Sequence, residues 1–191
     1  MTAISFRAHS GNYYCVTEAE FQAVFNEHKD AVYRFVWRMT SSATVAEDIA
    51  QDVFITLLRA PGRFDPVRGT MRSFLLGIAR NLALKRWRDE HRWEELDDET
   101  FRPDPVDPKR GDVAEIVGAA VRALPPLQRE VLILAEYDEL TLEEIAHAVE
   151  SEIGTVKSRL HRARENLRRM LASLGPAKTE KGERSSHGTI R

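Results

Sequence analysis

The side chains best suited to chemistry are basic and hydroxyl groups in the last third of the chain. Over residues 153–167, apolar side chains recur at helical spacing: Ile153, Val156, Leu160, Ala163 and Leu167. Because successive helical residues turn by about 100°, the opposite face presents a set of hydrogen-bonding groups: Lys157, Ser158, His161 and Arg162. Such a helix fits the major groove of DNA, where base edges are exposed. The pattern predicts a recognition helix.

A shorter helix precedes it. Residues 141–149 place four apolar side chains on an inward face: Leu142, Ile145, Ala146 and Val149. A tight turn at residues 150–151 follows, and the small Ala146 allows the two helices to cross closely. Each feature alone also fits an amphipathic pair packed on a protein partner. The turn, the small crossing residue and the basic face together favour a DNA-binding helix-turn-helix.

Charge changes sign along the chain. Residues 59–92 contain nine basic and three acidic residues, residues 94–107 seven acidic and one basic, and residues 155–169 six basic and one acidic. The formal net charge of -2 therefore hides two basic regions on either side of an acidic one. It does not exclude a nucleic-acid partner.

Composition excludes several classes of protein. Hydrophobic residues make up 42% and charged residues 30%, without an apolar run long enough for membrane insertion. The single cysteine, Cys15, can form neither an intrachain disulfide nor a cysteine-rich zinc site. The first residues do not resemble a secretory signal, so we expect a cytoplasmic location. No nucleophile–base pair, metal-ligand cluster or phosphate-binding glycine loop stands out, so we expect no enzyme, catalytic residue, metal or cofactor.

Helix-start signals predict an all-α fold. Four capping boxes pair a Thr or Asp with a Glu three residues later: Thr17 with Glu20, Thr44 with Glu47, Asp112 with Glu115, and Thr141 with Glu144. We expect helices over 18–39, after residue 44, and over 70–92, with a Pro- and Gly-containing loop before the third. Expected core residues of that third helix are Phe74, Leu75, Ile78, Leu82 and Trp87.

The same signals divide the chain into two small helical domains. We expect an N-terminal extension at 1–16, a helical domain at 17–92, a flexible acidic linker at 93–111, a helix-turn-helix domain at 112–174 and a disordered tail at 175–191. The linker contains three prolines and little apolar material.

Four segments carry a family resemblance. Residues 154–164 (GTVKSRLHRAR) and 124–131 (LPPLQREV) resemble region 4 of extracytoplasmic-function (ECF) sigma factors of the sigma-70 family. Residues 46–54 (AEDIAQDVF) resemble that family's polymerase-binding helix, and residues 69–81, containing FLLGIARN, its promoter-melting segment. The resemblance covers residues 17–171 in the family's order.

The resemblance implies a factor that gives RNA polymerase core enzyme its promoter specificity. Its contacts with the minus-thirty-five element would come from Thr155, Lys157, Ser158, Arg159, His161 and Arg162. Its contacts with the minus-ten element would come from Arg63, Arg68, Arg72, Arg80, Asn81, Lys85 and Arg88, with Asn81 reading a base edge and the loop at 63–70 holding an unstacked base. Its polymerase-binding residues would be Glu47, Asp48, Gln51 and Asp52. The expected partners are promoter DNA, the β′ coiled coil and β flap of the polymerase, and an anti-sigma factor.

Two alternatives and one departure accompany this interpretation. An autonomous helix-turn-helix regulator would bind its operator without polymerase. The basic residues and the acidic face at 47–52 could also be solvated surface with nothing bound. Where the family usually has Gly in the turn, this chain has Glu150, so we expect a left-handed backbone at a residue with a Cβ.

Overall fold

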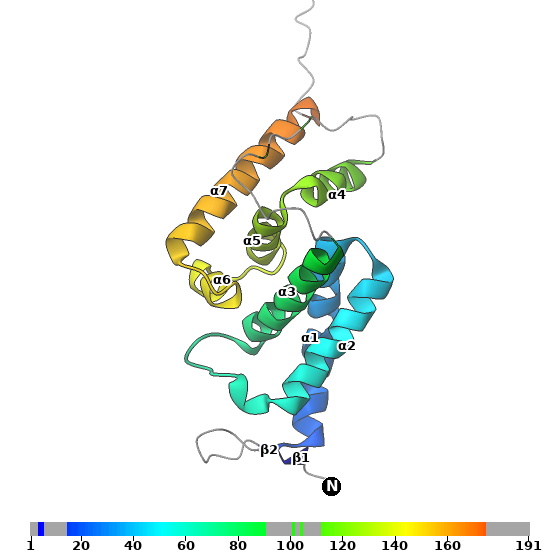
Figure 1. Cartoon of the computed structure of the whole chain (residues 1–191), viewed down its shortest axis with the longest axis vertical. Coiled ribbons are helices and arrows are strands. Elements are labelled where there is room, and N and C mark those ends of the chain that lie inside the picture. Colours follow the sequence, from blue (N-terminus) through cyan, green and yellow to red (C-terminus); the bar gives the residue numbers. More distant parts are fainter. Residues whose placement is uncertain (1–3, 6–14, 91–100, 102–103, 105–111, 175–191) are drawn as a thin grey trace, which may run out of the picture.

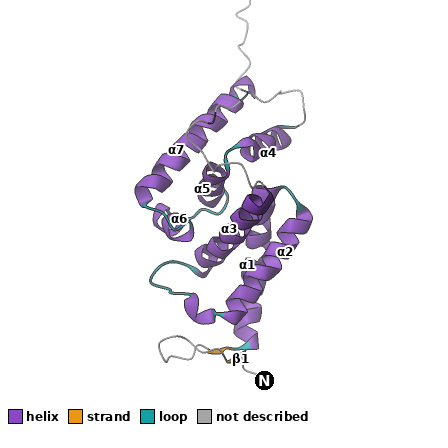
Figure 2. Ribbon diagram, viewed as in Figure 1, coloured by secondary structure: helices purple, strands orange, loops and turns teal. Residues whose placement is uncertain are grey.

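The computed structural model describes residues 4–5, 15–90, 101, 104 and 112–174. The prediction of an all-α fold with two helical domains is confirmed (Figures 1 and 2). The N-terminal domain contains α1 (Glu18–Thr40), α2 (Ala43–Arg59), the short 3-10 helix η1 (Pro61–Arg63) and α3 (Met71–Glu90). The C-terminal domain contains α4 (Val113–Ala123), α5 (Pro126–Glu136), α6 (Leu142–Ala148), α7 (Ile153–Met170) and the 3-10 helix η2 (Ala172–Leu174). Two-residue strands β1 (Ile4–Ser5) and β2 (Cys15–Val16) pair antiparallel before α1.

Three of the four predicted caps begin helices. The Thr17 and Thr141 boxes form in full, and the Asp112 carboxylate accepts a hydrogen bond from the Glu115 amide at 2.9 Å. The Thr44 box was wrong, because Ser42 caps α2 and accepts from the amide of Val45. The reason lies in the preceding helix, which ends at left-handed Ser41 (φ 59°) and leaves Ser42 in the extended conformation that a cap requires.

The core of the N-terminal domain lies where α1, α2 and α3 meet. Rings of Phe25 and Phe54 pack edge to face with centroids 4.9 Å apart, and Phe21 joins them. On α3 the fully buried residues are Leu75, Leu76, Ala79 and Leu84. Four of the five residues that we expected in this core, Phe74, Ile78, Leu82 and Trp87, are only partly buried. The buried face of α3 therefore lies at a different angle around the helix than we expected, because α3 packs against α6 of the other domain as well as against α1 and α2.

The C-terminal domain packs α5 and α6 against the long α7. Val156, Leu160 and Ala163 of α7 are buried as predicted, whereas Ile153 at its start is 37% exposed. A buried polar pair crosses this core, in which the Asn166 side-chain amide donates to Gln128 Oε1 at 2.8 Å. This packing holds α7 with its opposite face directed to solvent.

The two domains lie against each other. Helix α3 contacts α6, and α1 contacts α5 (Figure 1). Buried apolar residues of both domains form one continuous cluster, against which the partly buried Phe101 also packs. The predicted linker (93–111), apart from Phe101 and Asp104, and the predicted tail (175–191) lie outside the described residues, as does most of the N-terminal extension.

Candidate nucleic-acid and polymerase interface

The helix-turn-helix is built from local signals. The Thr141 hydroxyl accepts from the Glu144 amide at 3.2 Å, and the Glu144 carboxylate accepts from the Thr141 amide at 3.0 Å, which begins α6. After α6 the chain turns at Glu150, whose φ of 52° confirms the predicted left-handed backbone. The Ser151 amide closes the turn by donating to the Ala146 carbonyl at 3.0 Å. Helix α7 then begins at Ile153.

The outward face of α7 carries most of the residues predicted for the minus-thirty-five element. Lys157, Ser158 and His161 are exposed, and Thr155 and Arg162 are partly buried. Arg159 differs from them, because its side chain is only 19% exposed and its Nη1 lies 3.9 Å from Glu130 Oε1. The structure thus brings five of the six together on the side of α7 away from Val156 and Leu160, and directs Arg159 toward α5.

The residues predicted for the minus-ten element fall into two groups. One group is exposed on α3 and the preceding loop: Arg63, Arg68, Asn81, Lys85 and Arg88. The other group, Arg72 and Arg80, points to the C-terminal domain, although we expected it to face DNA. Arg80 Nε and Nη2 donate to the Glu130 carboxylate at 2.7 and 3.0 Å, and the Arg80 side chain is 12% exposed.

Arg72 makes the second ion pair between the domains. Its Nη2 donates to Asp138 Oδ1 at 2.8 Å, and Asp138 is buried. Burial raises the pKa of the Asp138 carboxyl, and the nearby Arg72 partly opposes that effect. Burial likewise raises the pKa of Glu130, which is opposed by Arg80 and Arg159. Both carboxyl groups are therefore largely shielded from water in the folded chain.

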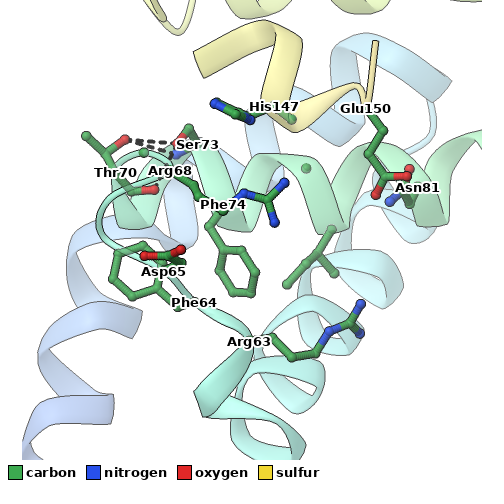
Figure 3. Close-up of a pocket in the computed structure, with 14 residues that line it drawn as sticks. Arg63, Phe64, Asp65, Arg68, Thr70, Ser73, Phe74, Asn81, His147 and Glu150 are labelled. Atoms are coloured by element: carbon green, nitrogen blue, oxygen red, sulfur yellow. Dashed lines mark hydrogen bonds between the residues drawn. The ribbon is translucent and has the colours of Figure 1, made fainter. Parts of the chain in front are cut away.

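A cavity of about 350 Å³ lies beside the loop that was expected to hold an unstacked base. Figure 3 shows Phe64 and Phe74 on one side of it, with ring centroids 5.6 Å apart, and His147 and Glu150 of the C-terminal domain on another. Asn81 also lines the cavity. Aromatic faces beside basic groups suit a nucleic-acid base.

The predicted polymerase-binding residues share one exposed face of α2. Glu47, Asp48, Gln51 and Asp52 are all exposed, because Ile49 and Val53 turn the opposite face into the core. The result is a compact surface of carboxylates and one amide.

Sequence reasoning missed three residues of α5 and the turn after it: Arg129, Glu130 and Asp138. Arg129 Nη1 donates to the carbonyl of Met39 at 2.6 Å, which joins α5 to the end of α1, and Nη2 donates to that of Leu124 at 2.8 Å. Burial, together with a nearby arginine, lowers the Arg129 pKa to about 10. The available signal was a charged pair set directly before the apolar run at 131–134, a place where charged side chains are rarely found without partners.

The described part of the chain offers neither a cluster of metal ligands nor a membrane-spanning helix. Those residues contain no group of three or more His, Cys, Asp or Glu side chains that could hold a metal ion. No described helix is both long and apolar enough to cross a membrane.

Comparisons with known proteins match both halves. A model of sigma-70 region 2 matches residues 24–93, and a model of sigma-70 region 4 matches residues 114–167. The chain is 34% identical over 154 residues to the ECF RNA polymerase sigma factor SigE of Mycolicibacterium smegmatis, covering 76% of this chain and 59% of that protein. It is 32% identical over 161 residues to the ECF RNA polymerase sigma factor RpoE of Cereibacter sphaeroides, covering 81% and 88%.

A solved structure agrees with these matches. The sigma factor RpoE of Bartonella quintana, crystallised with the anti-sigma factor NepR, superimposes with a TM-score of 0.64 at 25% identity, covering 80% of this chain and 97% of that one.

Proposed function

Because this chain belongs to the extracytoplasmic-function sigma factors of the sigma-70 family, we propose that it acts in the cytoplasm as a promoter-specificity subunit that catalyses no reaction itself. Its α7 reads the minus-thirty-five element, α3 with its preceding loop opens the minus-ten element, and α2 binds the polymerase core enzyme. The observation that carries this proposal is the exposed basic face of α7 after a left-handed turn.

The α7 face supports base reading in the major groove. Lys157 and Arg162 can donate to guanine edges or phosphates, and Ser158 and His161 can reach neighbouring groups. At present the Ser158 hydroxyl donates to the Thr155 carbonyl at 2.9 Å, a bond within the helix that rotation of the side chain can exchange for a base contact.

The α2 face supports polymerase binding. Its exposed carboxylates at Glu47, Asp48 and Asp52 complement a basic helical surface such as we expect on the β′ coiled coil. The C-terminal domain would contact the β flap, which brings the two domains to separate sites on one enzyme.

Capture of the chain by immobilised core enzyme tests whether the α2 face binds polymerase. We expect Asp48→Lys to weaken capture by immobilised core enzyme about tenfold or more, since a like charge replaces a complementary one. Asp30→Lys is the matched control, because Asp30 is also an exposed acid, on α1. Equal capture of both variants would refute the assignment of α2.

The autonomous regulator is the second candidate, favoured by the complete helix-turn-helix alone. Gel shifts distinguish the two. A sigma factor binds duplex promoter weakly alone and specifically with core enzyme, whereas a regulator binds tightly without it.

A protein inhibitor is also part of the proposal. The sigma factor RpoE of Bartonella quintana was solved in complex with an anti-sigma factor, and its similarity to this chain supports an anti-sigma factor here. Co-purification from a native host with a tagged chain tests this.

A further inference from the structure

The first turn of α7 leaves an aliphatic side chain exposed at the end of the basic face. Ile153 is 37% exposed, whereas Val156 and Leu160, which continue the apolar pattern, are 0% and 5% exposed. Because residues four apart share one side of a helix, Ile153 stands in line with the exposed Lys157 rather than with the buried residues. Packing within the chain therefore does not account for the exposed part of this side chain.

The next residue, Gly154, lies in the middle of the same outward face. It is exposed, it precedes Ser158 by four residues, and a Cβ added to it would meet no atom of the described chain within 4 Å. Its φ is not positive, so neither crowding nor backbone conformation in the described chain requires glycine here. Glycine destabilises a helix relative to alanine. What it provides is bare backbone, against which a partner can come closer than a side chain would allow.

Charge near this turn favours a base edge over a phosphate as the group that approaches it. Glu152, directly before the turn, is exposed and makes no side-chain capping hydrogen bond. Its negative charge repels a phosphate at this end of the helix, whereas Lys157 attracts one a turn further on. Helix α7 begins beside α6 at the outer edge of the molecule (Figure 1). In a helix-turn-helix, the first residues of the second helix are the ones that reach base edges in the major groove.

We propose that the first turn of α7 belongs to the promoter-reading surface: Ile153 contacts the C5 methyl group of a thymine in the minus-thirty-five element, and Gly154 lets the duplex approach closely enough for that contact. The thymine methyl is the apolar group that the major groove presents, and aliphatic side chains recognise it by contact. This inference rests on the function proposed for α7 and names one base that the helix selects.

The test uses the full chain with core enzyme and a fluorescein-labelled promoter duplex. Its minus-thirty-five sequence is taken from the members of a promoter library that this enzyme transcribes. Each thymine of that sequence is replaced in turn by deoxyuridine, which removes only the C5 methyl group and keeps every hydrogen-bonding group. Fluorescence anisotropy gives the apparent Kd of each duplex.

We expect one replacement by deoxyuridine to weaken binding of the unmodified chain about threefold to fivefold, which corresponds to the loss of one buried methyl group. Ile153→Ala should weaken binding to the thymine duplex at least as much and should be insensitive to that replacement, because the contact is already lost. Ile153→Val should be intermediate, and it keeps the test informative if Ile153→Ala fails to fold. If no thymine is sensitive, or if Ile153→Ala is as sensitive as the unmodified chain, the inference is overturned.

Gly154→Ala tests the close approach separately. It should raise the melting temperature, because alanine favours a helix and the new Cβ meets nothing within the described chain. It should nevertheless weaken promoter binding about fivefold or more, because moving the helix away from the groove disturbs its base contacts. Gly118→Ala is the matched control in α4, where the nearest neighbour of a Cβ is the movable end of the Arg122 side chain. Promoter binding by Gly154→Ala equal to that of the control would overturn the role of Gly154.

Two further variants separate this contact from the proposed function. Val113→Ala shortens an exposed aliphatic side chain at the start of α4 and should bind as the unmodified chain does. Lys157→Ala should weaken binding to thymine and deoxyuridine duplexes alike, since an ammonium group does not contact the methyl. If Lys157→Ala has no effect, the function proposed for α7 fails and the thymine contact fails with it. If Lys157→Ala weakens binding and Ile153→Ala does not, only the thymine contact is refuted.

Discussion

The left-handed turn residue of the helix-turn-helix gives a quantitative test of the local structure. Glu150 has φ 52° and is exposed, so its replacement by glycine removes little packing. A left-handed conformation costs a residue with a Cβ about 1–2 kcal/mol. Glycine in turn loses about 0.5–1 kcal/mol through its greater freedom in the unfolded chain. The difference predicts that Glu150→Gly stabilises the protein by about 0.5–1 kcal/mol.

Thermal unfolding followed by circular dichroism measures this effect. Because the buried cluster is continuous across both domains, we treat unfolding as one transition, for which this gain corresponds to about 1–4 °C. Glu143→Gly is the matched control: Glu143 is exposed but helical, in α6, and the change should lower stability by about 0.5–1 kcal/mol. An unchanged or lower melting temperature for Glu150→Gly would refute the strain argument.

Three further predictions concern promoter reading, pH and the core. Arg162→Ala should relax discrimination between bases at one upstream promoter position. Lys85→Ala should instead weaken binding to all promoters alike, and should reduce the slope of log affinity against log salt concentration by about 0.9. Burial lowers the pKa of His28, so the unfolded chain takes up its proton first and unfolding free energy should fall as pH drops below 6.5. In the core, Asn166→Ala should cost about 1–3 kcal/mol, because it leaves the Gln128 side chain without the bond from Asn166.

Each of these three predictions has its own measurement and its own contradicting result. Promoter profiles of the two basic-residue variants at several salt concentrations test the first, and identical effects on every promoter would remove the distinction. Measured by urea unfolding, the free energy of unfolding of His28→Gln should fall less between about pH 7 and pH 5 than that of the unmodified chain. The raised pKa values of Glu130 and Asp138 act in the opposite direction, so the variant must be compared with the unmodified chain at each pH. Asn166→Ala with unaltered urea stability would contradict the buried bond.

Features set by neighbouring residues were predictable. Capping boxes and helical periodicity located α1, α6 and α7 because both depend on residues within two turns of each other. The left-handed Glu150 followed from the family resemblance, because Glu150 stands where the family usually has Gly, and its φ of 52° agrees. The start of α2 was missed because Ser42 and Thr44 are both good caps, and the choice depends on where α1 ends, at left-handed Ser41.

Pairing between the domains was not predictable in the same way. Arg80 and Glu130 are 50 residues apart, and an ion pair at that separation leaves no periodic signal. A basic helix was therefore interpreted as facing outward along its whole length, although Arg72 and Arg80 are turned to the other domain. The small residue Gly77 on the same helix was the indication that another element approaches closely, since a Cβ there would lie 3.2 Å from the Ala148 carbonyl oxygen.

The central claim is that this chain directs RNA polymerase to particular promoters. The most direct measurement is transcription from a promoter library by purified core enzyme, with and without the chain, with start sites mapped by sequencing. We expect initiation at a restricted set of promoters sharing one minus-thirty-five and one minus-ten sequence, and only when the chain is present. The same distribution of start sites in both reactions would contradict the account.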